Sequence, residues 1–389
     1  MENIGKPFQQ FPNKHSATGT TIFTVMSALA QQYNAINLSQ GFPDFHIDEQ
    51  LSRLLGEAAH DGHNQYAPMA GLPALRQAIA INFKRRYGLD IDADNEITIT
   101  PGATYAIYTA FTAILQAGDE VIVLEPAYDS YIPNIEMNGA IAVPIALSAP
   151  GFEVDWNKIK EAITPRTKAV IINTPHNPTG AIWTKEDWNQ LADLVRDTNI
   201  IILSDEVYEQ LVFDGLQHYS VLEHPELRQR SFALYSFGKV FNNTGWKIGY
   251  CIAPPSFTQA FRRIHQFVSF TVNTPGQYAL AMHLNNDSAA PVHTVMQQKR
   301  DHFLSLLKDT PFTVFEPANG SYFQLVGYGQ ISDMPDMEFA QWLTKEYGVA
   351  TIPLSPFYKN KKDDKLVRFC FAKKEETLNE AVSRLKKLR

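Results

Sequence analysis

Short apolar runs typical of buried β-strands alternate along much of the chain with longer stretches in which apolar residues recur at helical spacing. This alternation predicts an α/β fold with a mainly parallel central sheet. The expected strands are residues 97–100, 120–124, 141–146, 169–173, 200–205, 232–236 and 249–253. The expected helices include residues 72–87, 105–116, 185–198 and 255–270.

The sequence changes character beyond about residue 298. A helix over 298–308, strands near 322–326 and 366–371, and a terminal helix predict a smaller α+β unit there. Residues 57–87 carry no strand pattern, so the sheet is expected to begin after an N-terminal segment. We therefore expect an N-terminal arm with part of the small domain (1–45), a large domain (46–290) and a small C-terminal domain (291–389).

Composition narrows the class of protein without identifying its function. The 389 residues are 44% hydrophobic and 19% charged, which supplies a large core and excludes a disordered chain. The net charge of −7 makes general nucleic-acid binding unexpected, because such a surface repels phosphate backbones. Two cysteines cannot build a disulfide framework or a thiolate zinc site, and no metal site is predicted.

Targeting and nucleotide-binding patterns are also missing from the sequence. Neither the first residues nor any later apolar run has the pattern of a signal peptide or a membrane span. No dinucleotide-binding or P-loop glycine pattern occurs. The sequence therefore predicts a soluble, cytoplasmic protein of enzyme size, with neither membrane nor nucleic acid as a partner.

Polar residues lie at the ends of predicted strands, at the edge where open α/β sheets bind their ligands. Asn177 precedes Pro178; this pair alone indicates a turn, but it also favours an extended backbone that directs the amide away from the strand. Asp205 ends a strand apolar enough to desolvate its carboxylate, although an acidic helix N-cap is the alternative. Lys239 follows the next strand, either as a solvated charge or as an amine with a lowered pKa.

Two of these groups, with a third segment, suit a ligand that carries an aldehyde, a charged ring nitrogen and a phosphate. The amine of Lys239 can react with an aldehyde, and the carboxylate of Asp205 can pair with a positive ring nitrogen. Residues 102–104 form a small-residue turn that opens a helix and offers backbone N–H groups to a phosphate. Ser236 and Lys247 can add a hydroxyl and a positive charge to that phosphate site.

Three further residues complete the description of the ligand. Tyr128 follows another strand and can offer an aromatic face to a flat ring. Asn177 and Tyr208 can donate hydrogen bonds to a phenolic oxygen. Aldehyde, ring nitrogen, phosphate, flat ring and phenolic oxygen together are the functional groups of pyridoxal 5′-phosphate (PLP).

The sequence resembles the fold-type I, class I/II aminotransferases that depend on PLP, over nearly its whole length. The most specific marks are the Gly-Phe-Pro-Asp-Phe stretch at 41–45, the Asn-Gln-Tyr-Ala-Pro stretch at 64–68 and Phe-Gly-Lys at 237–239. Within that family it is most similar to the methionine and the kynurenine (glutamine) aminotransferases. The resemblance implies a large PLP-binding domain and a smaller α+β domain.

The resemblance also assigns roles to individual residues. It implies that Lys239 bonds covalently to PLP, that Asp205 pairs with the pyridinium and that Asn177 and Tyr208 contact the 3′-oxygen. Lys239, Asp205 and Tyr208 would be the catalytic residues, and Tyr128 would stack on the ring. The expected phosphate contacts are Ala103, Thr104, Ser236 and Lys247, together with Tyr66 from the other subunit.

The last contact implies a homodimer with the site at the subunit interface. The resemblance further implies that Arg368 binds the substrate carboxylate, assisted by Gly41 and Asn177. One position departs from the family, because Lys247 stands where arginine is more common. Lysine keeps the charge there but loses the planar fork of the guanidinium.

The substrate is expected to be an L-amino acid with an apolar or aromatic side chain, and the acceptor a 2-oxo acid. Relatives specific for dicarboxylates use a second arginine, and no arginine lies between Arg263 and Arg300. Phe23, Tyr66 and Tyr128 would form an aromatic wall, although Phe23 could instead be a hydrophobic contact of the N-terminal arm. This reasoning favours methionine, phenylalanine, tyrosine or kynurenine as the donor, with glutamine also open.

Three alternatives remain at this stage. A cysteine-S-conjugate β-lyase would use the same scaffold and the same cofactor residues. Residues 236–239 also fit the S-x-x-K pattern of serine acyl-enzymes, but the accompanying S-D-N and K-T-G patterns are missing from the sequence. A cofactor-binding regulator would need a basic DNA-binding domain, for which the chain has neither room nor charge.

Overall fold

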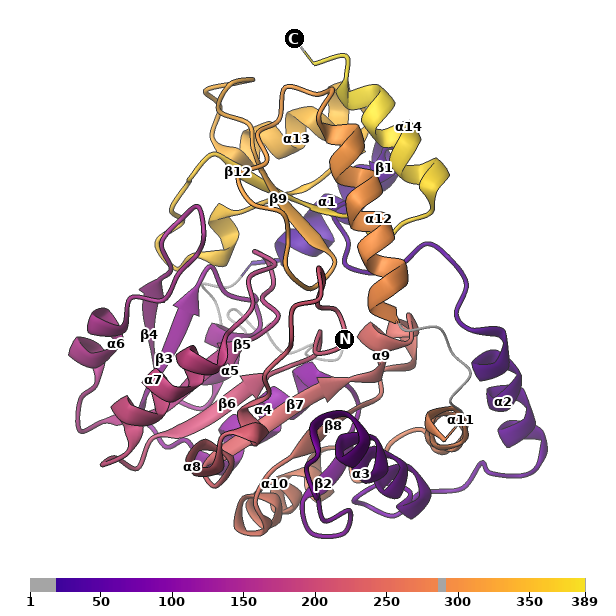
Figure 1. Cartoon of the computed structure of the whole chain (residues 1–389), viewed down its shortest axis with the longest axis vertical. Helices are drawn as coiled ribbons and strands as arrows, with labels where there is room; N and C mark the ends of the chain where they lie inside the picture. The colour runs from indigo at the N-terminus through magenta and orange to yellow at the C-terminus, as the bar shows by residue number, and fades with distance from the viewer. Residues whose placement is uncertain (1–18, 286–291, 389) are drawn as a thin grey trace, which may run out of the picture.

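A seven-stranded sheet forms the centre of the larger lobe, drawn in the lower half of Figure 1. The computed structural model describes residues 19–285 and 292–388. The strand order is β2-β8-β7-β6-β5-β3-β4, and β8 runs antiparallel to both of its neighbours while the other pairs are parallel. The strands are β2 (Ile97–Thr100), β3 (Glu120–Glu125), β4 (Ile141–Ala146), β5 (Thr167–Asn173), β6 (Ile201–Asp205), β7 (Ser231–Ser236) and β8 (Gly249–Ile252). The predicted mainly parallel α/β sheet and all seven of its strands are confirmed.

Alternating side chains along these strands bury both faces of the sheet, as the two-residue period of a strand requires. On β5, Val170 and Ile172 enter one apolar cluster, whereas Ala169 and Ile171 enter another. The first cluster includes side chains of α3 (Pro73–Tyr87), α7 (Lys185–Val195) and α11 (Thr274–Leu284). The second includes side chains of α4 (Ala103–Ile114), α5 (Tyr131–Met137) and α10 (Pro255–Val268). Helices therefore cover both faces, which is why these strands are apolar throughout.

The predicted helices are present with small shifts at their ends. The helix expected at 105–116 begins two residues earlier, because Gly102, at φ +85°, turns the chain directly into α4. The helix expected at 185–198 ends at Val195 and the one expected at 255–270 ends at Val268. Among the described residues, no helix has the length and apolar character needed to cross a membrane.

The smaller lobe, in the upper half of Figure 1, is built on a three-stranded antiparallel sheet. Its order is β11-β12-β9, with β9 at Phe323–Gly327, β11 at Ile352–Pro353 and β12 at Leu366–Cys370. The helices here are α12 (Val292–Leu307), α13 (Asp336–Glu346) and α14 (Glu375–Leu385). The helix and strands expected beyond residue 298 are thus confirmed, and α12 begins earlier than its sequence pattern suggests.

The N-terminal segment belongs spatially to this smaller lobe. Helix α1 (Ile22–Gln32) contacts α13 and the short strand β10 (Val349–Ala350), and β1 (Ile36–Asn37) pairs with β10 in parallel. Helix α2 (Glu49–His60) then leads to the larger lobe, where it packs on α11. The division into three parts stays a prediction, because residues 1–18 of the expected arm and the boundary at 290/291 lie outside the described residues.

Candidate active site

A cavity of about 350 Å³ lies between the two lobes, at the carboxyl ends of β5, β6 and β7. Residues from β9 and β12 of the smaller lobe and from the segment after β1 complete its lining. The structure brings together in this cavity every candidate site residue except Tyr66: Phe23, Gly41, Ala103, Thr104, Tyr128, Asn177, Asp205, Tyr208, Ser236, Lys239, Lys247 and Arg368.

Lys239 lies in the short helix α9 (Phe237–Val240), which follows β7 without a break. Its Nζ donates a hydrogen bond to the carbonyl oxygen of Gly41 at 3.2 Å. Burial lowers the pKa of this amine to about 8, since the ammonium form loses its hydration, and the charges of Lys247 and Arg368 act in the same direction. A neutral, nucleophilic amine is therefore accessible near neutral pH.

Asp205 ends β6 with its side chain buried. Its Oδ2 accepts a hydrogen bond from the hydroxyl of Tyr131 at 2.6 Å, and its Oδ1 accepts one from the backbone N–H of Val207 at 3.3 Å. Burial raises the pKa of the carboxyl to about 6, against the opposing effect of these two donors. Asp205 does not cap a helix, because the chain continues into a turn. A partner with positive charge would stabilise its ionised form.

Arg368 lies on β12 and is completely buried. One terminal nitrogen donates to Oδ1 of Asn177 at 2.7 Å and the other to the carbonyl of Ser39 at 2.9 Å, while its Nε has no partner. The guanidinium lies 3.8 Å from the ring centroid of Phe323. Burial lowers its pKa to about 10, so that it stays charged at neutral pH. A buried cation with an unused donor suits a carboxylate ligand.

Asn177, in the loop after β5, is held by Asn173 at the end of that strand. Its backbone N–H donates to Oδ1 of Asn173 at 2.8 Å, and the Nδ2 of Asn173 donates to the carbonyl of Asp205 at 2.8 Å. The amide that accepts from Arg368 is therefore tied to the strand that carries Asp205. This link between two parallel strand ends fixes the two candidate residues relative to each other.

A candidate anion site lies at the N-terminus of α4. The first N–H groups of a helix have no partner within it, and they point with the positive end of the helix dipole. A Cβ placed on Gly102 would lie 3.3 Å from Nζ of Lys247, so the ammonium stands directly beside this turn. A Cβ on Gly249 would collide with the carbonyl of Tyr235 and lie 3.1 Å from the N–H nitrogen of Ala103. Glycine at 249 thus lets β8 approach both β7 and α4.

Aromatic side chains form one wall of the cavity. Phe23 of α1 lies with its ring centroid 6.4 Å from that of Tyr128 and 5.9 Å from that of Phe357. Its ring is also 5.3 Å from the guanidinium of Arg368. Phe23 therefore makes a hydrophobic contact of the N-terminal segment and lines the cavity at the same time. The hydrophobic contact is therefore confirmed, whereas a contact of Phe23 with the substrate stays a prediction.

Tyr66 is the candidate that lies outside the cavity. Its side chain is 82% exposed and packs edge-on against Phe270 at 5.7 Å. The sequence reasoning placed its contact in the other subunit, and the position of Tyr66 on the surface leaves that role as a proposal.

Sequence reasoning missed Tyr131 and Asn173, which both contact Asp205. Tyr131 begins α5, and a turn at 128–131 separates it from Tyr128. Whether its hydroxyl reaches Asp205 depends on that turn, so no pattern in the sequence pointed to this contact. Asn173 is the last residue of an apolar strand, as Asp205 is, and the same argument would have found it.

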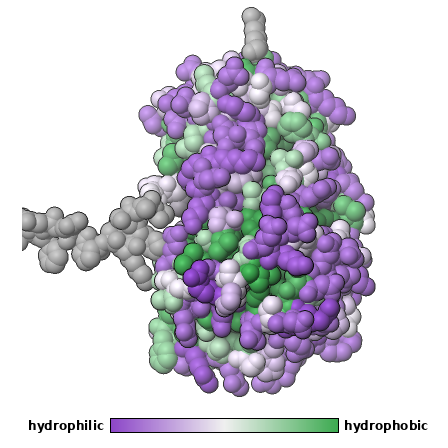
Figure 2. Space-filling view, turned by 90° about the vertical axis from the view of Figure 1, so that its left-hand side faces the viewer, coloured by the Kyte–Doolittle hydropathy of each residue, from purple (hydrophilic) through white to green (hydrophobic). Residues whose placement is uncertain are grey.

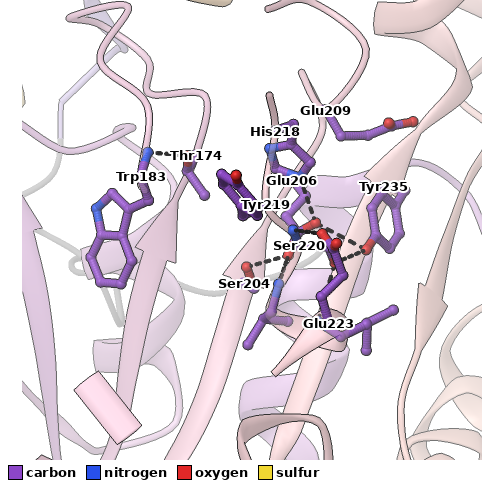
Figure 3. A network of polar contacts seen from close by, with 12 residues as sticks. Thr174, Trp183, Ser204, Glu206, Glu209, His218, Tyr219, Ser220, Glu223 and Tyr235 are labelled. Carbon is purple, nitrogen blue, oxygen red and sulfur yellow. Dashed lines mark hydrogen bonds and ion pairs between the residues drawn. The ribbon is translucent and has the colours of Figure 1, made fainter. Parts of the chain in front are cut away.

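The residue directly after β6, Glu206, carries a fully buried carboxylate (Figure 3). Its Oε1 accepts from the hydroxyl of Ser204 at 2.8 Å and from the N–H of Val221 at 3.0 Å. Its Oε2 accepts from the hydroxyl of Tyr235 at 3.0 Å and lies 2.9 Å from Nε2 of His218. These four partners hold the end of β6, and with it the backbone of Asp205, against β7 and against the segment that connects β6 to β7.

Comparison with known proteins identifies the family. Residues 33–385 match the family described as aminotransferase class I and II. The chain is 48% identical to a methionine aminotransferase of Escherichia coli, with 95% of this chain and 96% of that protein covered. It is 33% identical to a kynurenine–oxoglutarate transaminase of Dictyostelium discoideum, over 97% and 96% of the two chains. A solved Escherichia coli structure, reported with a methionine aminotransferase function, superposes with a TM-score of 0.95 at 47% identity, over 98% of this chain and all of that one.

Replacing Asp205 with asparagine tests the electrostatics of the cavity in the cofactor-free protein. Because burial raises the pKa of Asp205 from 3.8 to about 6, the unfolded state ionises first and the wild type loses stability as the pH rises between those values. Above about pH 6 the unfolding free energy of the wild type is lower by the full amount, about 3 kcal/mol. Asp205→Asn should therefore be more stable than the wild type by that order above pH 6 and show no gain below about pH 4.

Urea unfolding across this pH range measures the difference. Asp193→Asn is the matched control, because Asp193 is exposed in a surface ion pair with Arg196 and should give no such pH-dependent gain. A difference between Asp205→Asn and wild type that stays constant from pH 4 to 8 would contradict the raised pKa.

Proposed function

Since this chain belongs to the class I and II aminotransferases, we propose that it transfers the amino group of an L-amino acid with an apolar or aromatic side chain to a 2-oxo acid, with PLP bound in the cavity between its lobes. One observation carries this proposal. A half-buried amine with a lowered pKa, a buried carboxylate and a buried guanidinium, those of Lys239, Asp205 and Arg368, line the same cavity.

The chemistry of the lining residues fits PLP. Asp205 is a desolvated carboxylate that lacks a cationic partner at bonding distance among the described residues, which suits a pyridinium nitrogen. Lys239 supplies an amine for the aldehyde. The N-terminus of α4 with Ala103 and Thr104, together with Ser236 and Lys247, would hold the phosphate.

Residues of the cavity lining also suit the flat ring and the phenolic oxygen of the cofactor. Tyr128 would stack on the ring, and Asn177 and Tyr208 would contact the 3′-oxygen. Burial raises the pKa of the Tyr208 hydroxyl well above its ordinary value, so this group remains a hydrogen-bond donor.

When bound, PLP supplies an electron-accepting ring that stabilises negative charge on the substrate's Cα. The neutral amine of Lys239 can take the proton from Cα and return a proton in the reverse direction, because its pKa of about 8 lies near the working pH. Asp205 keeps the ring nitrogen protonated. Arg368 binds the substrate carboxylate and so orients the Cα–H bond toward Lys239.

The lining of the cavity supports an apolar or aromatic substrate. Arg368 is the one arginine among the described residues that line it, so this chain places no second guanidinium in its own cavity for a side-chain carboxylate. Phe23 and Tyr128 present rings at the same end as Arg368. The similarity to proteins named methionine aminotransferase and kynurenine–oxoglutarate transaminase points in the same direction.

A survey of half-reactions tests the proposed function. The PLP-loaded protein is mixed with each common L-amino acid in the absence of a 2-oxo acid, and the loss of the cofactor's visible absorbance is timed. Methionine and the aromatic amino acids should react fastest and aspartate slowest, because apolar side chains match the cavity wall. Lys239→Ala should lose the visible band of the lysine-bound cofactor and should not complete the half-reaction with any amino acid, because no amine is present to move the Cα proton. Preference for aspartate would contradict the substrate class, and an intact band in Lys239→Ala would contradict the role of the lysine.

Arg368→Lys tests the carboxylate site. Lysine keeps the positive charge but cannot form two parallel hydrogen bonds, so kcat/KM for methionine should fall by about 10- to 100-fold, mainly through KM. Steady-state kinetics measure the effect. Arg196→Lys, at an exposed ion pair, is the control and should leave both constants unchanged. Unchanged kinetics in Arg368→Lys would remove this residue from the site.

The active form is proposed to be a homodimer in which Tyr66 reaches the phosphate site of the partner. Tyr66 and Phe267, 82% and 85% exposed, lie on one surface with Val268 and Phe270 at the end of α10. Exposed aromatic residues in such a group are typical of a surface that another protein covers. A second copy related by a twofold axis would bury them and bring Tyr66 to a cavity that it does not reach in its own chain.

Phe267→Glu tests this interface. The charge should weaken the dimer, giving a larger monomer fraction in sedimentation velocity and weaker PLP binding by the same protein. Met334→Glu, at another exposed apolar side chain in the smaller lobe, should change neither. A wild-type protein that is monomeric when saturated with PLP would rule out the dimer.

A further inference from the structure

A second cavity, of about 410 Å³, shares a wall with the candidate active site. Tyr131 and Asn173 line both cavities. Each also contacts Asp205, Tyr131 through its hydroxyl at 2.6 Å and Asn173 through its amide at 2.8 Å. A molecule in the second cavity would therefore touch the residues that hold Asp205 without entering the active site.

The interior of this second cavity is apolar and partly aromatic. Leu124, Leu147 and Ile171 contribute buried side chains from the sheet and from the residue after β4. Phe152 lines it from a positive φ of 55°, a backbone conformation that is unfavourable for a residue with this side chain. The loop thus turns its aromatic ring inward rather than exposing it.

Trp183 supplies the largest aromatic surface of the cavity. Its backbone N–H donates to the hydroxyl of Thr174 at 2.9 Å, and its indole is directed away from the Glu206 cluster (Figure 3). Trp156 and Trp188 pack against it with ring centroids at 5.5 and 4.7 Å. The indole is therefore held in place by its neighbours.

The charged side chains of the lining are both acidic. Glu153 is exposed and Asp187 half-buried, and no lysine or arginine is found among the described residues that line this cavity. His176 also lines it, and burial lowers its pKa to about 4, so it is neutral at physiological pH. Two carboxylates without an opposing cation attract positively charged ligands.

We propose that this second cavity binds a small organic cation with an apolar or aromatic body, and that its occupancy is transmitted to Asp205 through Tyr131. The volume is that of a small-molecule site. The indole of Trp183 can interact with a cation through its ring, and Glu153 and Asp187 provide the opposite charge. On the side of the molecule where α6 (Trp156–Ala162) and the edge strand β4 lie, hydrophobic residues gather in the middle of the face between hydrophilic ones (Figure 2).

Binding at this site is independent of the proposed function, whereas its transmission to Asp205 rests on that function. The probe for binding is benzyltrimethylammonium, which has no primary amine and cannot condense with an aldehyde. Titration of the PLP-loaded protein is followed by calorimetry and by tryptophan fluorescence. Benzyl alcohol, which is neutral, should bind at least about threefold more weakly.

Two variants locate the bound probe. Glu153→Gln should weaken its binding by about threefold, the size of an exposed charge contact, while Glu161→Gln, an exposed residue outside the cavity, should leave it unchanged. Val154→Phe places a ring in the cavity lining and should weaken binding by more than about tenfold while the protein stays folded. Absence of binding, or binding that persists in both Glu153→Gln and Val154→Phe, would overturn the site.

The transmission is read from the visible absorbance of the bound cofactor as a function of pH. A saturating probe should shift the midpoint of this titration in the wild type. In Tyr131→Phe, which keeps the ring but loses the hydroxyl, the probe should still bind while the shift disappears. A bound probe that leaves the wild-type titration unchanged would overturn the transmission, whereas a protein with no visible band before the probe is added would contradict the proposed function instead.

Discussion

The removal of charge from water is the constraint on which this structure depends. Lys239, Asp205 and Arg368 are three ionisable groups largely removed from water around one cavity, and desolvation shifts the pKa of each in the direction that favours its neutral form. Such a site is stable only if other groups satisfy the buried polar atoms. Lys239 donates to the carbonyl of Gly41, Asp205 accepts from the hydroxyl of Tyr131, and Arg368 donates to the amide oxygen of Asn177.

The fold provides these partners because parallel strands end at a common edge. β5 delivers Asn173 and, after a short turn, Asn177, while β6 delivers Asp205. The cluster around Glu206 holds the chain directly after β6, so it also fixes the strand end that carries Asp205. A carboxylate whose pKa has been raised by burial needs this rigidity, since a small displacement toward water would restore its ordinary pKa.

The strands and most of the cavity residues could be predicted from the sequence because they depend on local pattern. An apolar run of five to seven residues that ends in Asn173 or Asp205 predicts a strand, and it also predicts where the polar end of that strand lies. The reversed direction of β8 could not be predicted, since an apolar strand has the same pattern in either direction. Tyr131 was missed for a similar reason: whether its hydroxyl reaches Asp205 depends on the turn between β3 and α5, which the sequence pattern does not specify.

The two lobes contribute different groups to the cavity, and this division has a consequence for substrate selection. The groups proposed to hold the cofactor come from the larger lobe, whereas Arg368, Gly41 and Phe23 come from the smaller lobe and the N-terminal segment packed on it. Few polar contacts across the cavity join the two sets, among them that of Lys239 with Gly41 and that of Arg368 with Asn177. Both contacts use donors that the substrate and cofactor would themselves engage. Ligands that engage these donors would add bonds to those that already join the lobes elsewhere, such as the ion pair of Arg300 with Asp214 and the hydrogen bond from the Lys359 N–H to Glu125. The carboxylate of a correctly fitting amino acid would then help to hold the lobes together.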